Sequence, residues 1–137
     1  MYRSIEEAQH EIMTGDLVID NQVSQDLLIF TGPIIQKVFS TLIENSVRHG
    51  KTVTNIGLST TIEENTLTII YQDNGIGISE EEKDFIFEHR YGKHTGVGLF
   101  IAREILDISG LSIRETGIEG KGVRFEIIVP KEKFRFS

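Results

Sequence analysis

Two pairs of apolar segments, each divided by a short turn, constrain the fold of this chain most strongly. Residues 53–62 and 66–72 alternate between apolar and polar side chains on either side of Glu63–Asn65, which is typical of a half-buried β-hairpin. Residues 111–116 and 123–130 repeat this arrangement across the turn GIEGKG. Hairpin-linked strands predict a largely antiparallel or mixed sheet.

Helical periodicity marks the segments that would cover this sheet. We expect helices over residues 3–14, from Pro33 to the residue before Gly50, and over 97–109 with Gly110 as the cap. In the second helix, side chains at helical spacing should face the core: Ile35, Val38, Phe39, Leu42 and Ser46.

The remaining segments complete an α+β prediction. Residues 17–20 and 27–30 indicate a strand pair turned at Asn21–Ser24, and a short acidic helix should follow DNGIG. EHRYGKHTG has few core-type residues and predicts a mobile loop. We therefore expect a two-layer α/β sandwich, with a mixed, mostly antiparallel sheet and helices packed on one face.

Length and charge restrict the function classes. The 137 residues suit one domain, residues 1–137, and the net charge is -7. So acidic a chain should bind neither nucleic acid nor an anionic membrane surface. No cysteine is present, no apolar run reaches the ~20 residues of a membrane helix, and no signal-peptide pattern begins the sequence. We expect a cytoplasmic location.

Polar side chains share one face of the second predicted helix. Thr41, Glu44, Asn45 and Arg48 follow spacings of three, four and seven residues, which makes them neighbours on a helix. A solvated face explains this pattern on its own. An Asn beside a Glu and an Arg could instead supply an oxygen to a hard cation and a positive charge to a phosphate.

The segment DNGIG follows the apolar strand 66–72. Gly75 and Gly77 leave room for a close approach, and Asp73 can accept a hydrogen bond from an amine. An ordinary turn after a strand explains the segment equally well. Glu80 stands where the dinucleotide fingerprint needs glycine, so that motif is excluded.

A second glycine-rich segment opens the helix 97–109. At Gly96 and Gly98, free backbone amides and the helix dipole favour an anion without any net positive charge. Arg90 and Lys93 lie just upstream. A glycine-rich helix start without a ligand is the alternative.

Five segments resemble, in their order along the chain, the conserved sequence motifs (boxes) of sensor histidine kinase catalytic domains. LIENSVRHG, DNGIG, FIFEHRYG, GVGLFIAREI and GKGVRFEIIVP are similar to the N box, first glycine box, phenylalanine box, second glycine box and final glycine turn. The resemblance covers about residues 25–130. It implies the Bergerat-type ATP-binding fold shared with gyrase, heat-shock chaperones and mismatch-repair proteins. RYGKHTGVGLF and the short lid are similar to kinases common in methanogenic archaea.

The resemblance implies a role for each motif residue. Asn45 would coordinate Mg²⁺, Arg48 would contact phosphate, and His49 would pack on the nucleotide. Asp73 would accept a hydrogen bond from the adenine amino group, and Lys93 would meet the terminal phosphate when the lid closes. The other implied nucleotide contacts lie near the base, the lid or the phosphates: Gly75, Gly77, Arg90, Tyr91, Thr95, Gly96, Val97, Gly98 and Leu99.

The implied activity is phosphoryl transfer. The domain would bind ATP with Mg²⁺ and donate the γ-phosphate to a histidine on the separate phosphoacceptor (dimerisation) domain of the same kinase, from which a response regulator would receive it. Asn45, Glu44 and Lys93 are the predicted catalytic residues, with Glu44 as a base or as the group that orients the acceptor histidine. The isolated domain should be monomeric.

Three positions depart from the family pattern, and they keep alternatives open. Thr41 stands where histidine kinases usually carry Asn, Gly32 where a capping Asp is common, and Val123 where Thr is common. An anti-sigma-type serine kinase and a non-catalytic nucleotide-binding module of the same superfamily remain alternatives. His10, followed by Glu11, superficially resembles a phosphoacceptor, but we expect a surface residue.

Overall fold

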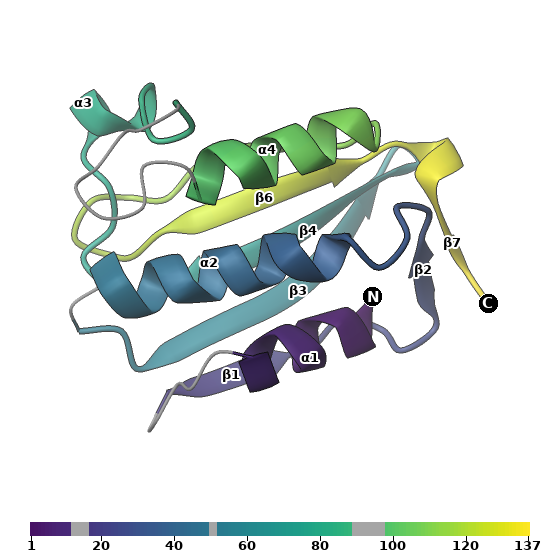
Figure 1. Cartoon of the computed structure of the whole chain (residues 1–137), viewed down its shortest axis with the longest axis horizontal. Coiled ribbons are helices and arrows are strands. Elements are labelled where there is room, and N and C mark those ends of the chain that lie inside the picture. The colour runs from purple at the N-terminus through teal and green to yellow at the C-terminus, as the bar shows by residue number, and fades with distance from the viewer. Residues whose placement is uncertain (12–16, 50–51, 89–97) are drawn as a thin grey trace.

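The computed structural model describes residues 1–11, 17–49, 52–88 and 98–137. Three helices, α1 (Tyr2–Glu11), α2 (Ile35–His49) and α4 (Gly98–Ile108), cover one face of a five-stranded sheet (Figure 1). The strands follow the order β1-β3-β4-β6-β5. Their bounds are β1 (Val18–Asn21), β3 (Asn55–Glu63), β4 (Thr66–Asp73), β5 (Ser112–Glu115) and β6 (Arg124–Val129).

The sheet is mixed and mostly antiparallel, as predicted. β1 runs parallel to β3, whereas the β3–β4, β4–β6 and β5–β6 pairs are antiparallel. Both predicted hairpins are confirmed. Glu64 and Asn65, with φ of 51° and 68°, turn β3 into β4, the backbone that a two-residue hairpin turn requires.

The predicted pairing of residues 17–20 with 27–30 is wrong. β1 joins the main sheet beside β3, and β2 (Leu27–Ile29) instead pairs with β7 (Phe134–Phe136) in a separate two-stranded sheet. An apolar alternation indicates which face of a strand is buried but not which strand lies beside it. β7 and the short 3-10 helix η1 (Lys131–Lys133) were not predicted.

The helices lie close to where periodicity places them. The first begins at Tyr2 rather than at residue 3 and is described to Glu11, and α2 begins at Ile35, two residues after Pro33. A turn precedes α2, in which Gln36 N–H donates to Pro33 O at 3.1 Å and Lys37 N–H to Ile34 O at 3.0 Å. The short acidic helix is α3 (Glu80–Lys83).

Gly110 ends α4 as predicted. Its φ is +83°, a left-handed value that suits glycine. Leu111 N–H donates to Leu106 O at 2.8 Å, and Gly110 N–H to Asp107 O at 3.1 Å. These two bonds satisfy carbonyls that the helix end would otherwise leave free.

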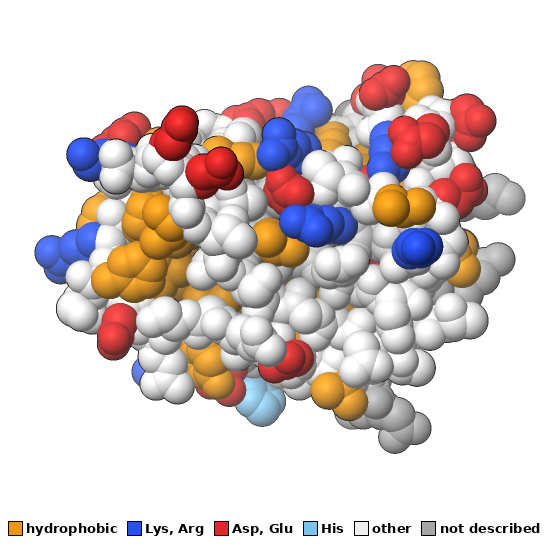
Figure 2. Space-filling model, turned by 180° about the vertical axis from the view of Figure 1, so that it is seen from behind, with side chains coloured by type: hydrophobic (Ala, Val, Ile, Leu, Met, Phe, Trp, Pro, Cys, Tyr) orange, Lys and Arg blue, Asp and Glu red, His pale blue; other side chains and the backbone are white. Residues whose placement is uncertain are grey.

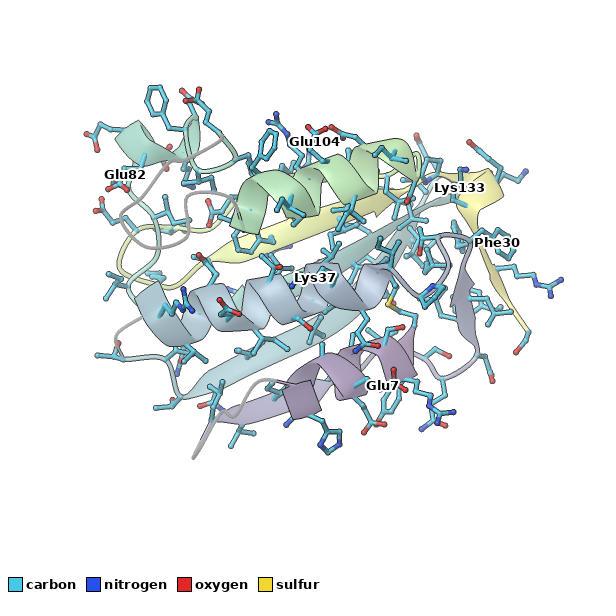
Figure 3. All side chains as sticks on the ribbon, in the orientation of Figure 1. Glu7, Phe30, Lys37, Glu82, Glu104 and Lys133 are labelled. Atoms are coloured by element: carbon cyan, nitrogen blue, oxygen red, sulfur yellow. The ribbon has the colours of Figure 1, made fainter. Side chains whose placement is uncertain are left out.

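The core lies between the helices and the sheet. All the core positions predicted for α2 are buried, and they meet a layer of strand side chains. That layer consists of Ile56, Leu58, Leu67, Ile69, Tyr71, Phe125, Ile127 and Val129. Charged side chains such as Glu7, Lys37 and Glu104 lie on the outer faces of the helices (Figure 3).

The opposite face of the sheet is open. Figure 2 shows it as largely uncharged, with charged side chains gathered toward one long edge. Within the described ranges, no helix is both long enough and apolar enough to cross a membrane.

Candidate functional site

Asp73 is the buried acid at the end of β4. It is 4% exposed, and its carboxylate accepts three hydrogen bonds. Oδ1 accepts from Gly75 N–H and Val123 N–H, both at 3.0 Å, and Oδ2 accepts from the Ser46 hydroxyl at 2.6 Å. A buried carboxylate needs such donors to offset its lost hydration. The side chain is therefore fixed by groups from α2, from the loop after β4 and from the residue before β6.

Tyr71 extends this network into the core. Its hydroxyl lies 2.6 Å from Ser46 Oγ and donates to Leu42 O at 3.0 Å. Burial is the main reason that the pKa of Tyr71 rises far above its ordinary value. The hydrogen bond with Ser46 lowers this pKa, and the nearby charge of Asp73 raises it. A phenol is already neutral at physiological pH, and the raised pKa keeps Tyr71 neutral in alkaline solution as well.

The turn between β5 and β6 closes over Asp73. At Gly122, φ is +106°, and a Cβ atom would lie 2.0 Å from Asp73 O. At Gly77, φ is +75°, and a Cβ atom would lie 2.9 Å from Ile118 O. Both positions thus require glycine because the two glycine segments lie against each other.

Asn74 connects the loop after β4 to the segment before β3. The sequence analysis did not predict this role. Its Oδ1 accepts from Thr54 N–H at 2.9 Å and from Asn55 N–H at 3.1 Å. Its amide donates to Thr54 Oγ1 at 2.8 Å. An Asn that follows a strand is a common turn residue, so its sequence position alone does not reveal these long-range bonds.

The polar face of α2 lies beside this network. Glu44 and Asn45 are half-buried, and Arg48 is exposed. Arg48 pairs with Glu44 at 3.1 Å. Within the described ranges, the Asn45 side chain has no hydrogen-bond partner. Asn45 directly precedes Ser46, so α2 brings an amide oxygen and an Asp73 contact to the same turn of helix.

Phe87 holds the segment that precedes residues 89–97. Its ring lies 6.1 Å from that of Phe125, and the Arg103 guanidinium of α4 lies 5.9 Å from its centroid. These contacts tie the phenylalanine box to the sheet and to α4. Gly98 and Leu99 form the start of α4, as predicted.

Several predicted contacts lie outside the described residues. These are Arg90, Tyr91, Lys93, Thr95, Gly96 and Val97. The side chain of His49 also lies outside them, although its backbone ends α2. The described predicted residues fall into three groups. Asp73, Gly75 and Gly77 lie at the end of β4 and in the loop after it, Glu44, Asn45 and Arg48 lie on α2, and Gly98 and Leu99 begin α4.

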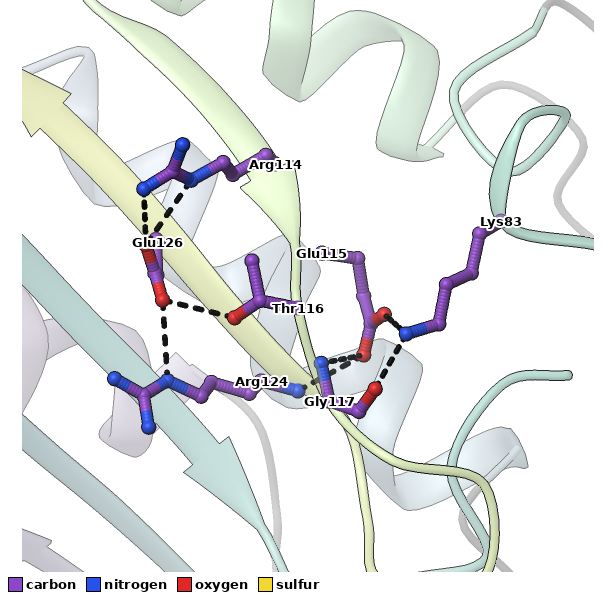
Figure 4. Close-up of polar contacts among 7 residues, drawn as sticks. All are labelled: Lys83, Arg114, Glu115, Thr116, Gly117, Arg124 and Glu126. Carbon is purple, nitrogen blue, oxygen red and sulfur yellow. Dashed lines mark hydrogen bonds and ion pairs between the residues drawn. The ribbon is translucent and has the colours of Figure 1, made fainter. Parts of the chain in front are cut away.

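A charged network next to the site was also missed. Lys83 of α3 pairs with Glu115 of β5 at 3.0 Å and donates to Gly117 O (Figure 4). Glu115 Oε2 accepts from the N–H groups of Gly117 and Arg124, each at 3.0 Å. The Glu115 side chain is 1% exposed. Burial opposes the charge of Lys83, yet hydrogen bonding and the negative charge of Glu115, aided by Glu80, raise its pKa above the ordinary value.

Comparison with known proteins defines the class. Residues 32–133 match the family of histidine kinase-, DNA gyrase B- and HSP90-like ATPases, and the chain belongs to this family, as its motifs predicted. The signal transduction histidine-protein kinase ArlS of Staphylococcus aureus is 31% identical over 102 residues, covering 68% of this chain and 23% of ArlS. The chain thus spans about a quarter of the length of the curated relatives that it matches.

Solved structures share the fold. The catalytic domain of histidine kinase ThkA, nucleotide-free, superposes with a TM-score of 0.77 at 22% identity over 96% of this chain and 92% of its own. The mycobacterial sensor histidine kinase MprB superposes with a TM-score of 0.76 at 18% identity, covering 93% of this chain and 89% of the MprB chain. Full-length ShkA in complex with AMPPNP superposes with a TM-score of 0.75 at 20% identity, covering 99% of this chain and 30% of ShkA. The α+β fold prediction is therefore confirmed.

Proposed function

We propose that this chain is the ATP-binding catalytic domain of a histidine kinase. It binds Mg-ATP and transfers the γ-phosphate to a histidine on a separate phosphoacceptor domain. The observation that carries this proposal is Asp73, a buried carboxylate held by three donors at the first glycine box of a chain in this family. The ArlS relative, itself a histidine-protein kinase, supports this reading over the two alternatives.

Asp73 recognises the base. Its carboxylate can only accept hydrogen bonds, so it suits the amino group of adenine. Gly75 and Gly77 leave space for the ring beside it. His49 of α2, with Tyr91 and Leu99, contributes further contact with the nucleotide.

Asn45 suits an Mg²⁺ ion that a nucleotide brings with it. Mg²⁺ prefers oxygen ligands, keeps several waters, and usually takes only one or two protein groups beside substrate phosphates. A half-buried amide oxygen without a partner among the described residues fits that demand. When bound, the ion would neutralise phosphate charge.

The phosphates would be held by amides and cations. α4 begins at Gly98, and the first N–H groups of a helix, which have no carbonyl partner within the helix, suit an anion. We assign the same role to Gly96, Thr95 and Val97. Arg48 adds positive charge from α2, and Arg90 and Lys93 add it from the segment before α4. Such positioning and charge neutralisation supply most of the catalysis in phosphoryl transfer.

Glu44 orients the acceptor histidine in this proposal. In the transfer, the bond from the γ-phosphorus to the bridging oxygen of ADP breaks while a bond to an imidazole nitrogen forms. Glu44 is paired with Arg48 at 3.1 Å. Engagement of Arg48 by phosphate would release the Glu44 carboxylate to accept a hydrogen bond from the other imidazole nitrogen.

The chain needs partners to act. Because it spans 23% of ArlS, we assign the acceptor histidine to another domain of the same kinase, and the final phosphate acceptor to a response regulator. We further propose that residues 1–137 form one domain that is monomeric on its own and acts in the cytoplasm without contacting membrane or nucleic acid.

Equilibrium binding of Mg-ATP tests the site. We expect Asp73→Asn and Asn45→Ala each to weaken binding about tenfold or more. Asn at position 73 replaces an acceptor oxygen by a donor amino group, and Ala at position 45 removes the amide oxygen. Asp20→Asn, the same exchange on β1 where Asp20 contacts Gln22, is the matched control and should bind as the wild type does. Equal binding by all variants would refute the assignment.

Phosphate transfer tests the activity separately. The domain is mixed with a supplied phosphoacceptor domain and labelled ATP, and acid-labile label on the acceptor histidine is measured. Tight ATP binding without transfer to any supplied acceptor would instead favour the non-catalytic alternative.

A further inference from the structure

Two buried hydroxyl groups connect the core to Asp73. Ser46 on α2 is 1% exposed and Tyr71 on β4 is fully buried. Ser46 Oγ lies 2.6 Å from both Asp73 Oδ2 and Tyr71 Oη, and Tyr71 Oη lies 3.0 Å from Leu42 O. The resulting chain of contacts runs from the α2 backbone through two side chains to the carboxylate.

We propose that Ser46 and Tyr71 are positioning residues that give this site its preference for a 6-amino purine. Ser46 holds the Asp73 carboxylate in one orientation, and Tyr71 holds Ser46. This inference rests on the proposed function, in which Asp73 receives the base of the nucleotide.

The number of donors on Asp73 supports the proposal. An ionised carboxylate offers about four acceptor positions. Oδ1 already accepts from the N–H groups of Gly75 and Val123, and Oδ2 accepts from Ser46. One position on Oδ2 is thus left for a ligand donor. A 6-amino group satisfies it, whereas a 6-oxo group would place an acceptor against an acceptor.

The hydroxyl protons fix this polarity. Leu42 O and the carboxylate can only accept hydrogen bonds. The Ser46 proton therefore serves Asp73, and the single Tyr71 proton is shared between Leu42 O and Ser46 Oγ. Tyr71 donates to Leu42 O, and burial, which raises its pKa, keeps it protonated even in alkaline solution. Ser46 then has its proton free for Asp73, which keeps the carboxylate an acceptor toward the ligand.

Val123 supplies no side-chain hydroxyl to this site. The family commonly has Thr there, and its hydroxyl would lie on the adenine side. Val123 gives Asp73 only its backbone N–H. The side-chain hydroxyl that reaches Asp73 comes from Ser46 of α2.

The test compares two nucleotides that share ribose, phosphates and metal. Dissociation constants of Mg-ATP and Mg-ITP, whose base carries a 6-oxo group, are measured for the chain and its variants. We expect Ser46→Ala to lower the preference for ATP over ITP by about five- to tenfold, mainly through weaker ATP binding. Tyr71→Phe, which keeps the ring, should lower it by about two- to threefold.

Two further variants separate positioning from a general loss of structure. Ser46→Thr retains the hydroxyl and should restore most of the preference. Ser40→Ala makes the same substitution at another buried serine of α2 and should leave the preference unchanged. A structural defect would weaken both nucleotides alike, whereas loss of positioning changes their ratio.

The outcomes distinguish the two proposals. If the wild type binds no Mg-ATP, the proposed function fails and this inference fails with it. If the wild type binds ATP but Ser46→Ala and Tyr71→Phe keep the wild-type ratio, or weaken both nucleotides equally, the positioning role alone is refuted.

Discussion

At the scale of single residues, a methyl group at Gly122 would collide with Asp73. The added Cβ would lie 2.0 Å from Asp73 O and 2.9 Å from its Oδ1, so the backbone of one segment must move. We expect Gly122→Ala to lower the free energy of unfolding by about 3 kcal/mol or more. Mg-ATP binding should weaken in parallel, and urea unfolding with binding measurements checks both effects.

Gly120 provides the control for Gly122. It has a similar backbone, with φ of +87°, but nothing lies within 4 Å of a Cβ placed there. Gly120→Ala should therefore cost only the left-handed strain, about 1–2 kcal/mol, and leave binding intact. Equal losses for the two variants would show that the contact with Asp73 is unimportant.

The sequence identified the residues that carry a recognisable motif, and it missed those that act through space. Asp73 and Asn45 stand in short segments whose order indicates the site. Ser46 was predicted only as a core-facing position, because a serine at helical spacing does not reveal a partner 27 residues away. Glu115 stands in the alternating pattern of an ordinary strand, which does not indicate a buried carboxylate. Its charge is balanced by Lys83, which lies on another element.

At the scale of elements, the Lys83–Glu115 pair joins α3 to β5. The Lys83 side chain is 16% exposed and that of Glu115 1%. Lys83→Met keeps the length but leaves a buried carboxylate without its cation, so we expect a loss of about 3 kcal/mol in the free energy of unfolding. Lys121→Met, on the exposed turn, should change it by no more than about 0.5 kcal/mol.

This pair also predicts a pH dependence. The folded pKa of Lys83 is raised, so its contribution is complete below the ordinary lysine pKa of about 10.4 and is lost as pH rises through the folded pKa. The difference in unfolding free energy between wild type and Lys83→Met should therefore persist at neutral pH and shrink in strong alkali. A difference independent of pH would contradict the pairing.

On the open face of the sheet, Glu126 predicts the opposite pH response. Arg114 donates to its Oε1 at 2.8 and 3.0 Å, and Thr116 donates to Oε2 at 2.8 Å (Figure 4). Burial works to raise the pKa of Glu126, but these bonds and the charges of Arg114 and Arg124 lower it. Its contribution is thus present above the ordinary glutamate pKa of about 4.3 and lost as pH falls through the folded pKa.

Comparison with Glu126→Gln measures this contribution. We expect wild type to exceed the variant in unfolding free energy from neutral pH down to about pH 5, and the difference to shrink in more acidic solution. Chemical denaturation at a series of pH values provides the curve. A difference that grows on acidification would reverse the sign and contradict the ion-pair network.

Among the elements, local hairpins were predictable and distant pairings were not. Short turns with Asn and Gly specify β3–β4 and β5–β6, because the partner strand is the next one in the chain. β1 finds its partner β3 only after α2 has crossed between them. β2 pairs with β7 about a hundred residues later, a contact that depends on the finished core and not on any local signal.

At the scale of the whole molecule, folding and nucleotide binding should be linked. The site joins the end of β4, α2 and the β5–β6 turn, and these elements meet only in the folded chain. A ligand that binds only the folded state, at a concentration one hundred times its Kd, adds about 2.7 kcal/mol to the free energy of unfolding. For a domain of this size, that corresponds to a rise in Tm on the order of 8 °C.

Removal of the metal separates the contributions of the nucleotide and of Mg²⁺ to this rise in Tm. We expect Mg-ATP to raise the Tm of the wild type, ATP with EDTA to raise it less, and Mg²⁺ alone to leave it unchanged, because Asn45 supplies a single ligand oxygen and phosphates must supply others. At the same Mg-ATP concentration, Asp73→Asn should show at most about half of the wild-type rise, because tenfold weaker binding lowers the added free energy from about 2.7 to about 1.4 kcal/mol, whereas Asp20→Asn should match the wild type. If EDTA made no difference to the rise with ATP, Asn45 would have no metal to bind, and its assigned role would be wrong even if the nucleotide site itself were correct.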